Sequence, residues 1–80
     1  MTEIETRLAE YIRAKIVKNP KKIIEVTTPL ISSGLIDSFH LVDLGVFVED
    51  EYDVRIEDSE LNAQTFDTIA QLAALIEERI

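Results

Sequence analysis

The spacing of apolar residues constrains this chain most, because such residues recur every three or four positions in three separate segments. This period places them on one face of a helix. The 80 residues include only two glycines and two prolines, too few for the many turns of a β fold. The pattern predicts an all-α fold with helices at about 3–17, 38–52 and 65–79. A chain of this length supports one small core, so we expect residues 1–80 to form a single domain.

The first helix has a predicted start and a predicted stop. Thr2 and Glu5 have the spacing of a capping box, and Asn19-Pro20 should end the helix because the residue before proline avoids the α region. A possible strand near the start of the next segment, residues 20–37, is rejected because no comparable second strand could pair with it. This connection should instead be held against the core by Ile23, Ile24, Leu30, Ile31, Leu35 and Ile36.

Two apolar sectors share the second helix, which should begin with Ser38 as its N-cap. The expected core face, with Gly45 beside it, consists of Leu41, Leu44, Val48 and Tyr52. The other sector consists of Phe39, Val42 and Val46, with Asp43 and Asp50 nearby. A surface helix in a small domain needs only one apolar stripe. The second sector therefore predicts an exposed docking face rimmed by carboxylates.

The rest of the chain should form an extended link, one short helical turn and a last helix. Glu57 or Asp58 could cap the turn, which runs to Leu61, and Thr65 is the expected N-cap of the last helix. The face that this helix should bury consists of Phe66, Ile69, Ala70, Ala73, Ile76 and Ile80. The complete prediction is a small four-helix bundle of three main helices and one short helix.

Charge is divided unevenly along the chain, whose net charge is −8. Residues 1–36 hold six basic and four acidic residues, whereas residues 37–80 hold two basic and twelve acidic ones. This balance argues against nucleic-acid binding, which needs a basic face, and directs any cationic partner to the second half. The sequence shows neither a secretory signal nor an apolar run long enough to span a membrane. We expect a monomer in the cytoplasm.

Few residues could carry chemistry of their own. The chain has no cysteine, which excludes a disulfide, a thiolate nucleophile and a zinc site built on sulfur. The acidic run 49–60 departs from a calcium-binding loop, because it has Val54 where that loop needs glycine and Glu49 where it begins with aspartate. We interpret this run as a solvated acidic face and expect no metal.

Residues 34–39, Gly-Leu-Ile-Asp-Ser-Phe, are the most informative stretch. Physical considerations alone favour a structural interpretation, in which Ser38 caps the helix, Asp37 faces its positive end and Gly34 allows the preceding turn. A functional interpretation notes that an exposed hydroxyl at a helix N-terminus could carry a phosphate. A serine hydrolase is rejected, because His40 is two residues from Ser38 and should point away from it on a helix.

The chain resembles the phosphopantetheine-dependent carrier proteins, the family of acyl carrier and peptidyl carrier proteins. Residues 34–39 resemble the family's G-x-x-D-S-[L/M/F] attachment signature. The likeness continues through residues 41–44, 46–52, 54–58, 61 and 66–69. This resemblance implies a right-handed bundle of three main helices plus a short one, and a carrier rather than an enzyme. It also implies that a transferase attaches 4′-phosphopantetheine from coenzyme A to Ser38, which would give a chain without cysteine a thiol for carrying thioesters.

The resemblance also implies roles for other residues. Asp37 would help the transferase and its metal to orient Ser38. The apolar docking face would be Phe39, Val42 and Val46, and its acidic rim would be Asp43, Glu49 and Asp50. Basic patches on partner enzymes would recognise this rim. Those partners would be the phosphopantetheinyl transferase, an acyl- or aminoacyl-activating ligase, and acyl transferases or synthases.

Some residues depart from the pattern of fatty-acid carriers. The first half of the chain is basic, Phe39 stands where leucine is commonest, and His40 stands where an acid is frequent. Phe39, Gly45 and the Val-Phe-Val run at residues 46–48 are more similar to free-standing carriers of specialised or amino-acid-activating pathways. The cargo stays open among fatty acyl, hydroxyacyl, aminoacyl and polyketide groups. The alternative is an acidic helical interaction module that is never modified, in which Ser38 is only a cap.

Overall fold

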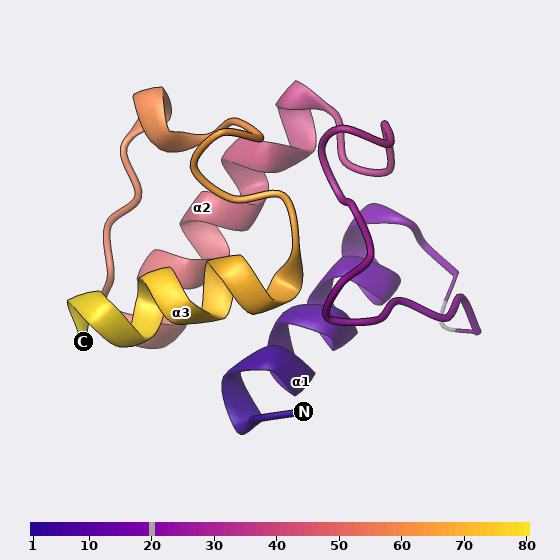
Figure 1. Ribbon diagram of the computed structural model, residues 1–80, viewed down its shortest axis with the longest axis horizontal. Coiled ribbons are helices and arrows are strands. Elements are labelled where there is room, and N and C mark those ends of the chain that lie inside the picture. The colour runs from indigo at the N-terminus through magenta and orange to yellow at the C-terminus, as the bar shows by residue number, and fades with distance from the viewer. Residues whose placement is uncertain (20) are drawn as a thin grey trace.

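The computed structural model describes residues 1–19 and 21–80, and in this part of the chain every regular element is a helix (Figure 1). The elements are α1 (Glu3–Tyr11), a π-helical turn η1 (Ile12–Ile16), α2 (Ser38–Tyr52), a short 3₁₀ helix η2 (Asp58–Glu60) and α3 (Ile69–Arg79). The predicted all-α fold of three main helices and one short helix is confirmed.

α1 starts with the predicted capping box. The Glu5 amide donates to Thr2 Oγ1 at 3.2 Å, and the Thr2 amide donates to Glu5 Oε1 at 2.7 Å. The helix continues as η1, and the chain turns away at Lys18, which has a left-handed φ of 58°. Pro20, the predicted terminator, lies outside the described residues, and the helix has already ended before it.

The connection that follows is held mainly by the predicted apolar residues. Ile24, Leu30 and Ile36 are buried, and Ile31 and Leu35 are half-buried. The prediction is wrong for Ile23, which is 79% exposed. Neighbouring residues of an extended segment point to opposite sides, and Ile24 takes the side that faces the core.

α2 buries its predicted core face, with Leu41, Leu44 and Val48 buried and Tyr52 half-buried. Gly45 does not mark a close approach of two segments. A Cβ atom at this position would lie 3.8 Å from Leu61 Cδ2, which is an ordinary van der Waals distance. The helix ends at Asp53, which has a left-handed φ of 56°.

α3 begins later than the sequence predicts. Thr68 Oγ1 accepts the Gln71 amide at 3.1 Å, so Thr68 is the N-cap and the predicted cap, Thr65, is wrong. Thr65 is engaged elsewhere, because its amide donates to Asn62 Oδ1 at 3.0 Å in the preceding turn. The buried side chains of this region are Phe66, Ile69, Leu72, Ala73 and Ile76. Ile80, predicted to be buried, is 73% exposed because it follows the last residue of the helix.

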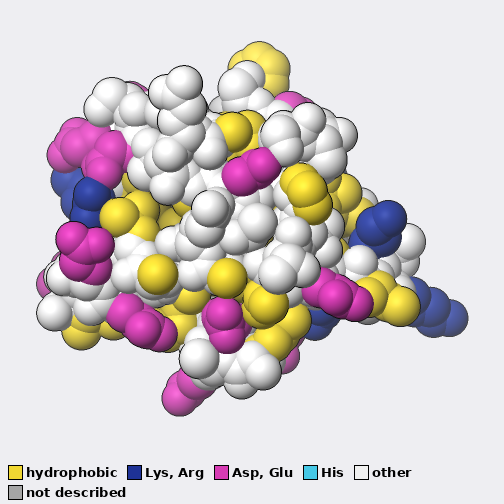
Figure 2. All heavy atoms as spheres, viewed as in Figure 1, with side chains coloured by type: hydrophobic (Ala, Val, Ile, Leu, Met, Phe, Trp, Pro, Cys, Tyr) yellow, Lys and Arg dark blue, Asp and Glu magenta, His cyan; other side chains and the backbone are white. Residues whose placement is uncertain are grey.

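The helices enclose one apolar core. α3 packs against α1, and Figure 1 shows the start of α2 at the end of the molecule remote from both chain termini. Among the described residues every buried side chain is apolar. Figure 2 shows that further hydrophobic side chains reach the surface between acidic ones, while some basic side chains gather at the edge where the chain leaves α1.

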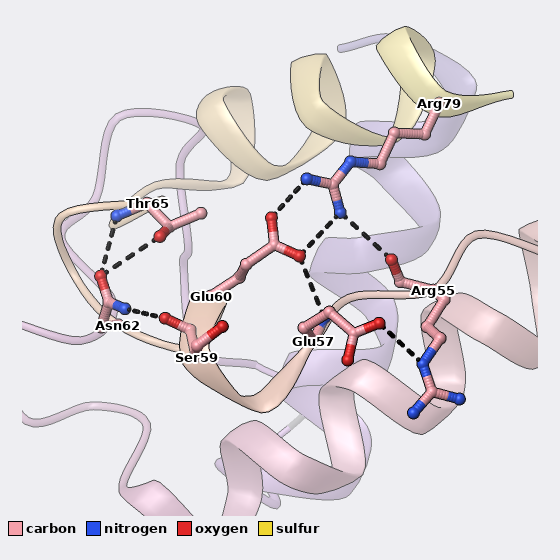
Figure 3. Close-up of polar contacts among 7 residues, drawn as sticks. All are labelled: Arg55, Glu57, Ser59, Glu60, Asn62, Thr65 and Arg79. Atoms are coloured by element: carbon pink, nitrogen blue, oxygen red, sulfur yellow. Dashed lines mark hydrogen bonds and ion pairs between the residues drawn. The ribbon is translucent and has the colours of Figure 1, made fainter.

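A polar contact fastens η2 to the end of α3 (Figure 3). η2 has the predicted cap, in which the Glu57 amide donates to Glu60 Oε1 at 3.1 Å. Arg79 donates to both carboxylate oxygens of Glu60, with Nη1 3.0 Å from Oε1, and also to the backbone carbonyl of Arg55 at 3.1 Å. We call this contact the Glu60–Arg79 clasp. It fixes the segment between α2 and α3.

Candidate functional site

Ser38 is the first residue of α2, and its side chain is exposed. Within the part of the chain that the structure describes, its hydroxyl makes no hydrogen bond. An exposed and uncommitted hydroxyl is open to modification by another protein.

Asp37, not Ser38, is the N-cap of α2. Its backbone is extended, with a φ of −87° and a ψ of 176°, and its Oδ1 accepts the His40 amide at 2.9 Å. The prediction that Ser38 caps the helix is therefore wrong, because the carboxylate one residue earlier already takes that donor. The hydrogen bond from the His40 amide is the largest cause that lowers the pKa of Asp37, followed by the contacts with the His40 ring. Asp37 is thus an ionised carboxylate beside the free hydroxyl.

The side chain of His40 pairs with Asp37 and does not face only solvent. Its Nδ1 lies 2.8 Å from Asp37 Oδ1, and its side chain is about one third exposed. The imidazole is therefore directed to the capping carboxylate. This pair restrains the side chains on either side of Ser38.

The turn before α2 is anchored to the start of α3 by Asp67. Its Oδ1 accepts the amides of Ile31 and Ser32 at 2.7 and 2.9 Å, and its Oδ2 accepts the Ser32 hydroxyl at 2.5 Å. These bonds, led by that of the Ser32 hydroxyl, lower the pKa of Asp67. Gly34 then supplies a φ of 81°, which glycine adopts readily, as the chain turns toward Ser38. The Asp67 contacts are not foreseen from the sequence, because they span 35 and 36 residues.

The second apolar sector of α2 is exposed, as predicted. Phe39 is 83% exposed, and Val42 and Val46 are 52% and 53% exposed. We call these three residues, which the sequence predicts to contact partner proteins, the docking face. The acidic rim, Asp43, Glu49 and Asp50, is exposed around them. Together they place an apolar patch with a negative border next to Ser38 on the same helix.

Two absences concern only residues 1–19 and 21–80. In this part of the chain, no group of three or more His, Cys, Asp or Glu side chains could hold a metal ion. None of the helices formed by these residues has the length and apolar character needed to cross a bilayer.

Comparison with known protein families identifies the class of this protein. Residues 6–76 match a family described as the phosphopantetheine attachment site. The match covers most of the chain, so the chain belongs to this family of carrier proteins. Its members are not catalysts, and they carry a covalently attached 4′-phosphopantetheine. They interact with a modifying transferase and with biosynthetic enzymes. Comparisons with curated proteins and with solved structures give no match.

Proposed function

We propose that Ser38 is the residue to which 4′-phosphopantetheine is attached. The main support is that the Ser38 hydroxyl is exposed and has no hydrogen-bonding partner among the described residues. Ser38 also lies at the start of the helix that bears the docking face. Asp37, as an ionised neighbour, supports the proposed role of helping the metal of the transferase to orient Ser38. The chain then carries acyl or aminoacyl groups as thioesters and delivers them to partner enzymes.

The other serines offer less suitable hydroxyls. Ser32 donates to Asp67, and Ser33 donates to the carbonyl of Pro29 at 2.6 Å. Ser59 belongs to η2, a helix of three residues fastened by the clasp. Ser38 alone combines an uncommitted hydroxyl with a neighbouring apolar face, which favours it as the attachment residue.

The first turn of α2 also suits a mobile prosthetic group. Asp37 already accepts a hydrogen bond from the His40 amide. That amide could otherwise donate to a phosphate at this end of the helix. One donor fewer is then available to hold a phosphate on Ser38 against the helix. This arrangement supports an arm that reaches several enzymes in turn.

The attachment chemistry needs little from the carrier itself. Ser38 Oγ forms a bond to the phosphorus next to pantetheine in coenzyme A, the pyrophosphate bond breaks, adenosine 3′,5′-bisphosphate leaves, and the hydroxyl proton is lost. The bound group supplies a thiol, which a chain without cysteine lacks. Ser38 provides the position, and the docking face provides recognition.

We propose that partner enzymes bind the acidic rim through basic surface patches. These partners are the phosphopantetheinyl transferase, an acyl- or aminoacyl-activating ligase, and acyl transferases or synthases. Contacts between exposed charges are weak and are screened by salt, which suits a carrier that must leave each enzyme after delivery.

The candidate cargoes are fatty acyl, hydroxyacyl, aminoacyl and polyketide groups, in fatty-acid or secondary-metabolite biosynthesis. We further propose that residues 1–80 act as one monomeric carrier domain in the cytoplasm.

Intact-mass spectrometry tests the proposal. The protein is incubated with coenzyme A and a broad-specificity phosphopantetheinyl transferase. We expect the wild type and the control variant Ser33→Ala to gain the mass of one phosphopantetheine, and Ser38→Ala to gain none. Modification of Ser38→Ala would overturn the assignment of Ser38. If all three proteins stay unmodified, the chain acts instead as an interaction module.

A further inference from the structure

The seam between α1 and α2 carries an aromatic pair. The rings of Tyr11 and Phe47 are stacked, with centroids 4.1 Å apart and planes inclined by 8°. The Tyr11 hydroxyl donates to the backbone carbonyl of Asp43 at 3.3 Å, which ties α1 to α2 at this point. Both aromatic residues are half-buried, so part of the pair stays accessible to a partner.

A shallow hollow opens beside this pair, lined by Tyr11, Asp43, Val46, Phe47 and Asp50. It therefore joins three surfaces: the aromatic pair, one residue of the docking face, and two carboxylates of the acidic rim. Asp43 and Asp50 lie seven residues apart, which places them two helical turns apart on the same side of α2. Negative charge thus borders an aromatic and aliphatic floor.

The basic side chains nearest to the aromatic pair, Arg7 and Lys15, line a separate hollow on the side of α1. Within the described part of the chain, neither Asp43 nor Asp50 takes part in an ion pair. Arg7, which lies on the same seam, is committed to Glu51, with Nη2 2.5 Å from Oε2. Burial, and then the negative charge of Asp43, raises the pKa of Tyr11.

We propose that this hollow binds an arginine side chain presented by an enzyme that docks on α2. A planar guanidinium can pair with a carboxylate while its face lies on an aromatic ring, whereas an ammonium is a compact, strongly hydrated charge. The inference rests on the proposed function and deepens it. It extends the docking surface beyond α2 onto α1, and it names one side chain that the partner supplies.

Nuclear magnetic resonance titration of the ¹⁵N-labelled, unmodified protein tests the arginine site. The probes are N-acetyl-arginine amide and N-acetyl-lysine amide, each at low ionic strength. We expect the arginine probe to bind about twofold to fivefold more tightly, in line with the added contact to the aromatic face. The largest shifts should fall on the amides of Tyr11, Phe47 and Asp50. Equal affinity for both probes, or shifts spread over the acidic surface, would overturn the proposal.

Three variants sharpen this titration. Asp43→Asn with Asp50→Asn should remove the binding of both probes, and Phe47→Leu should lower the affinity for arginine to that for lysine. The matched control, Glu77→Gln with Glu78→Gln on α3, changes the net charge equally and should bind as the wild type does. Unchanged arginine affinity in Phe47→Leu would contradict the role of the aromatic pair. Because the titration uses unmodified protein, its result does not depend on whether Ser38 accepts phosphopantetheine, which mass spectrometry decides separately.

Discussion

At the scale of single residues, Asp37 caps α2 and Ser38 presents a free hydroxyl. The sequence predicts both tasks for Ser38. Aspartate and serine are both good N-caps, so the Asp37-Ser38 pair does not reveal which of them caps α2. The backbone settles the choice, because Asp37 is extended and accepts the His40 amide, whereas Ser38 is already the first helical residue. Capping by Asp37 leaves the Ser38 hydroxyl free.

This division predicts that only one of two substitutions lowers the stability of the fold. Asp37→Ala removes the cap and should lower the midpoint of urea unfolding. Ser38→Ala removes an exposed hydroxyl that makes no contact, so its free energy of unfolding should stay within about 0.5 kcal/mol of the wild-type value. Urea titration followed by circular dichroism measures both. A larger loss of stability in Ser38→Ala than in Asp37→Ala would contradict the assignment of the cap.

At the scale of elements, two polar contacts hold α3 at its two ends. Asp67 fastens the connection before α2 to the start of α3, and the Glu60–Arg79 clasp fastens η2 to its end. Local signals predict that the helices exist, but these contacts join residues 35 and 19 positions apart. They depend on the completed fold, and sequence spacing alone therefore does not predict them.

The clasp gives the stability of the fold a defined acid dependence. Hydrogen bonding to Arg79 is the main cause that lowers the pKa of Glu60 from 4.5 to about 2. The folded state therefore binds this proton less tightly than the unfolded state. The stabilisation is complete above pH 4.5 and is lost as the pH falls toward about 2.

Thermal melting from about pH 6 down to about pH 2 measures this dependence. The melting temperature of the wild type should fall more steeply across this range than that of Glu60→Gln, which has no carboxyl group to protonate. Glu77→Gln lies outside the clasp and should keep the wild-type slope. Parallel curves for the wild type and Glu60→Gln would show that the clasp does not contribute.

At the scale of the whole molecule, periodicity predicts the helices and the exposed sector of α2 correctly, because both depend on local spacing. The errors occur where the fold decides which residue is used. Ile23 is exposed because its neighbour Ile24 points into the core. Thr65 does not cap α3 because it is hydrogen-bonded to Asn62 in the preceding turn. The partners of His40 and Asp67 are likewise set by the three-dimensional arrangement of the chain.

The distribution of charge predicts how the whole molecule meets its partners. Replacing Asp43 and Glu49 by lysine should lower kcat/KM for the phosphopantetheinyl transferase at least about tenfold at low salt, because it reverses the rim that attracts a basic surface. The difference should shrink as salt is added. Glu77→Lys with Glu78→Lys, an equal change of charge on α3, should have a much smaller effect. Equal losses in both double variants would show a response to net charge alone.

Locating the added group on the chain tests the proposed attachment site most directly. The wild-type protein, modified by the transferase with coenzyme A, is fragmented in a mass spectrometer to find the residue that carries phosphopantetheine. We expect the added mass on every fragment that contains Ser38 and on none that lacks it. Finding it on Ser32, Ser33 or Ser59 would contradict the proposal that Ser38 carries the prosthetic arm.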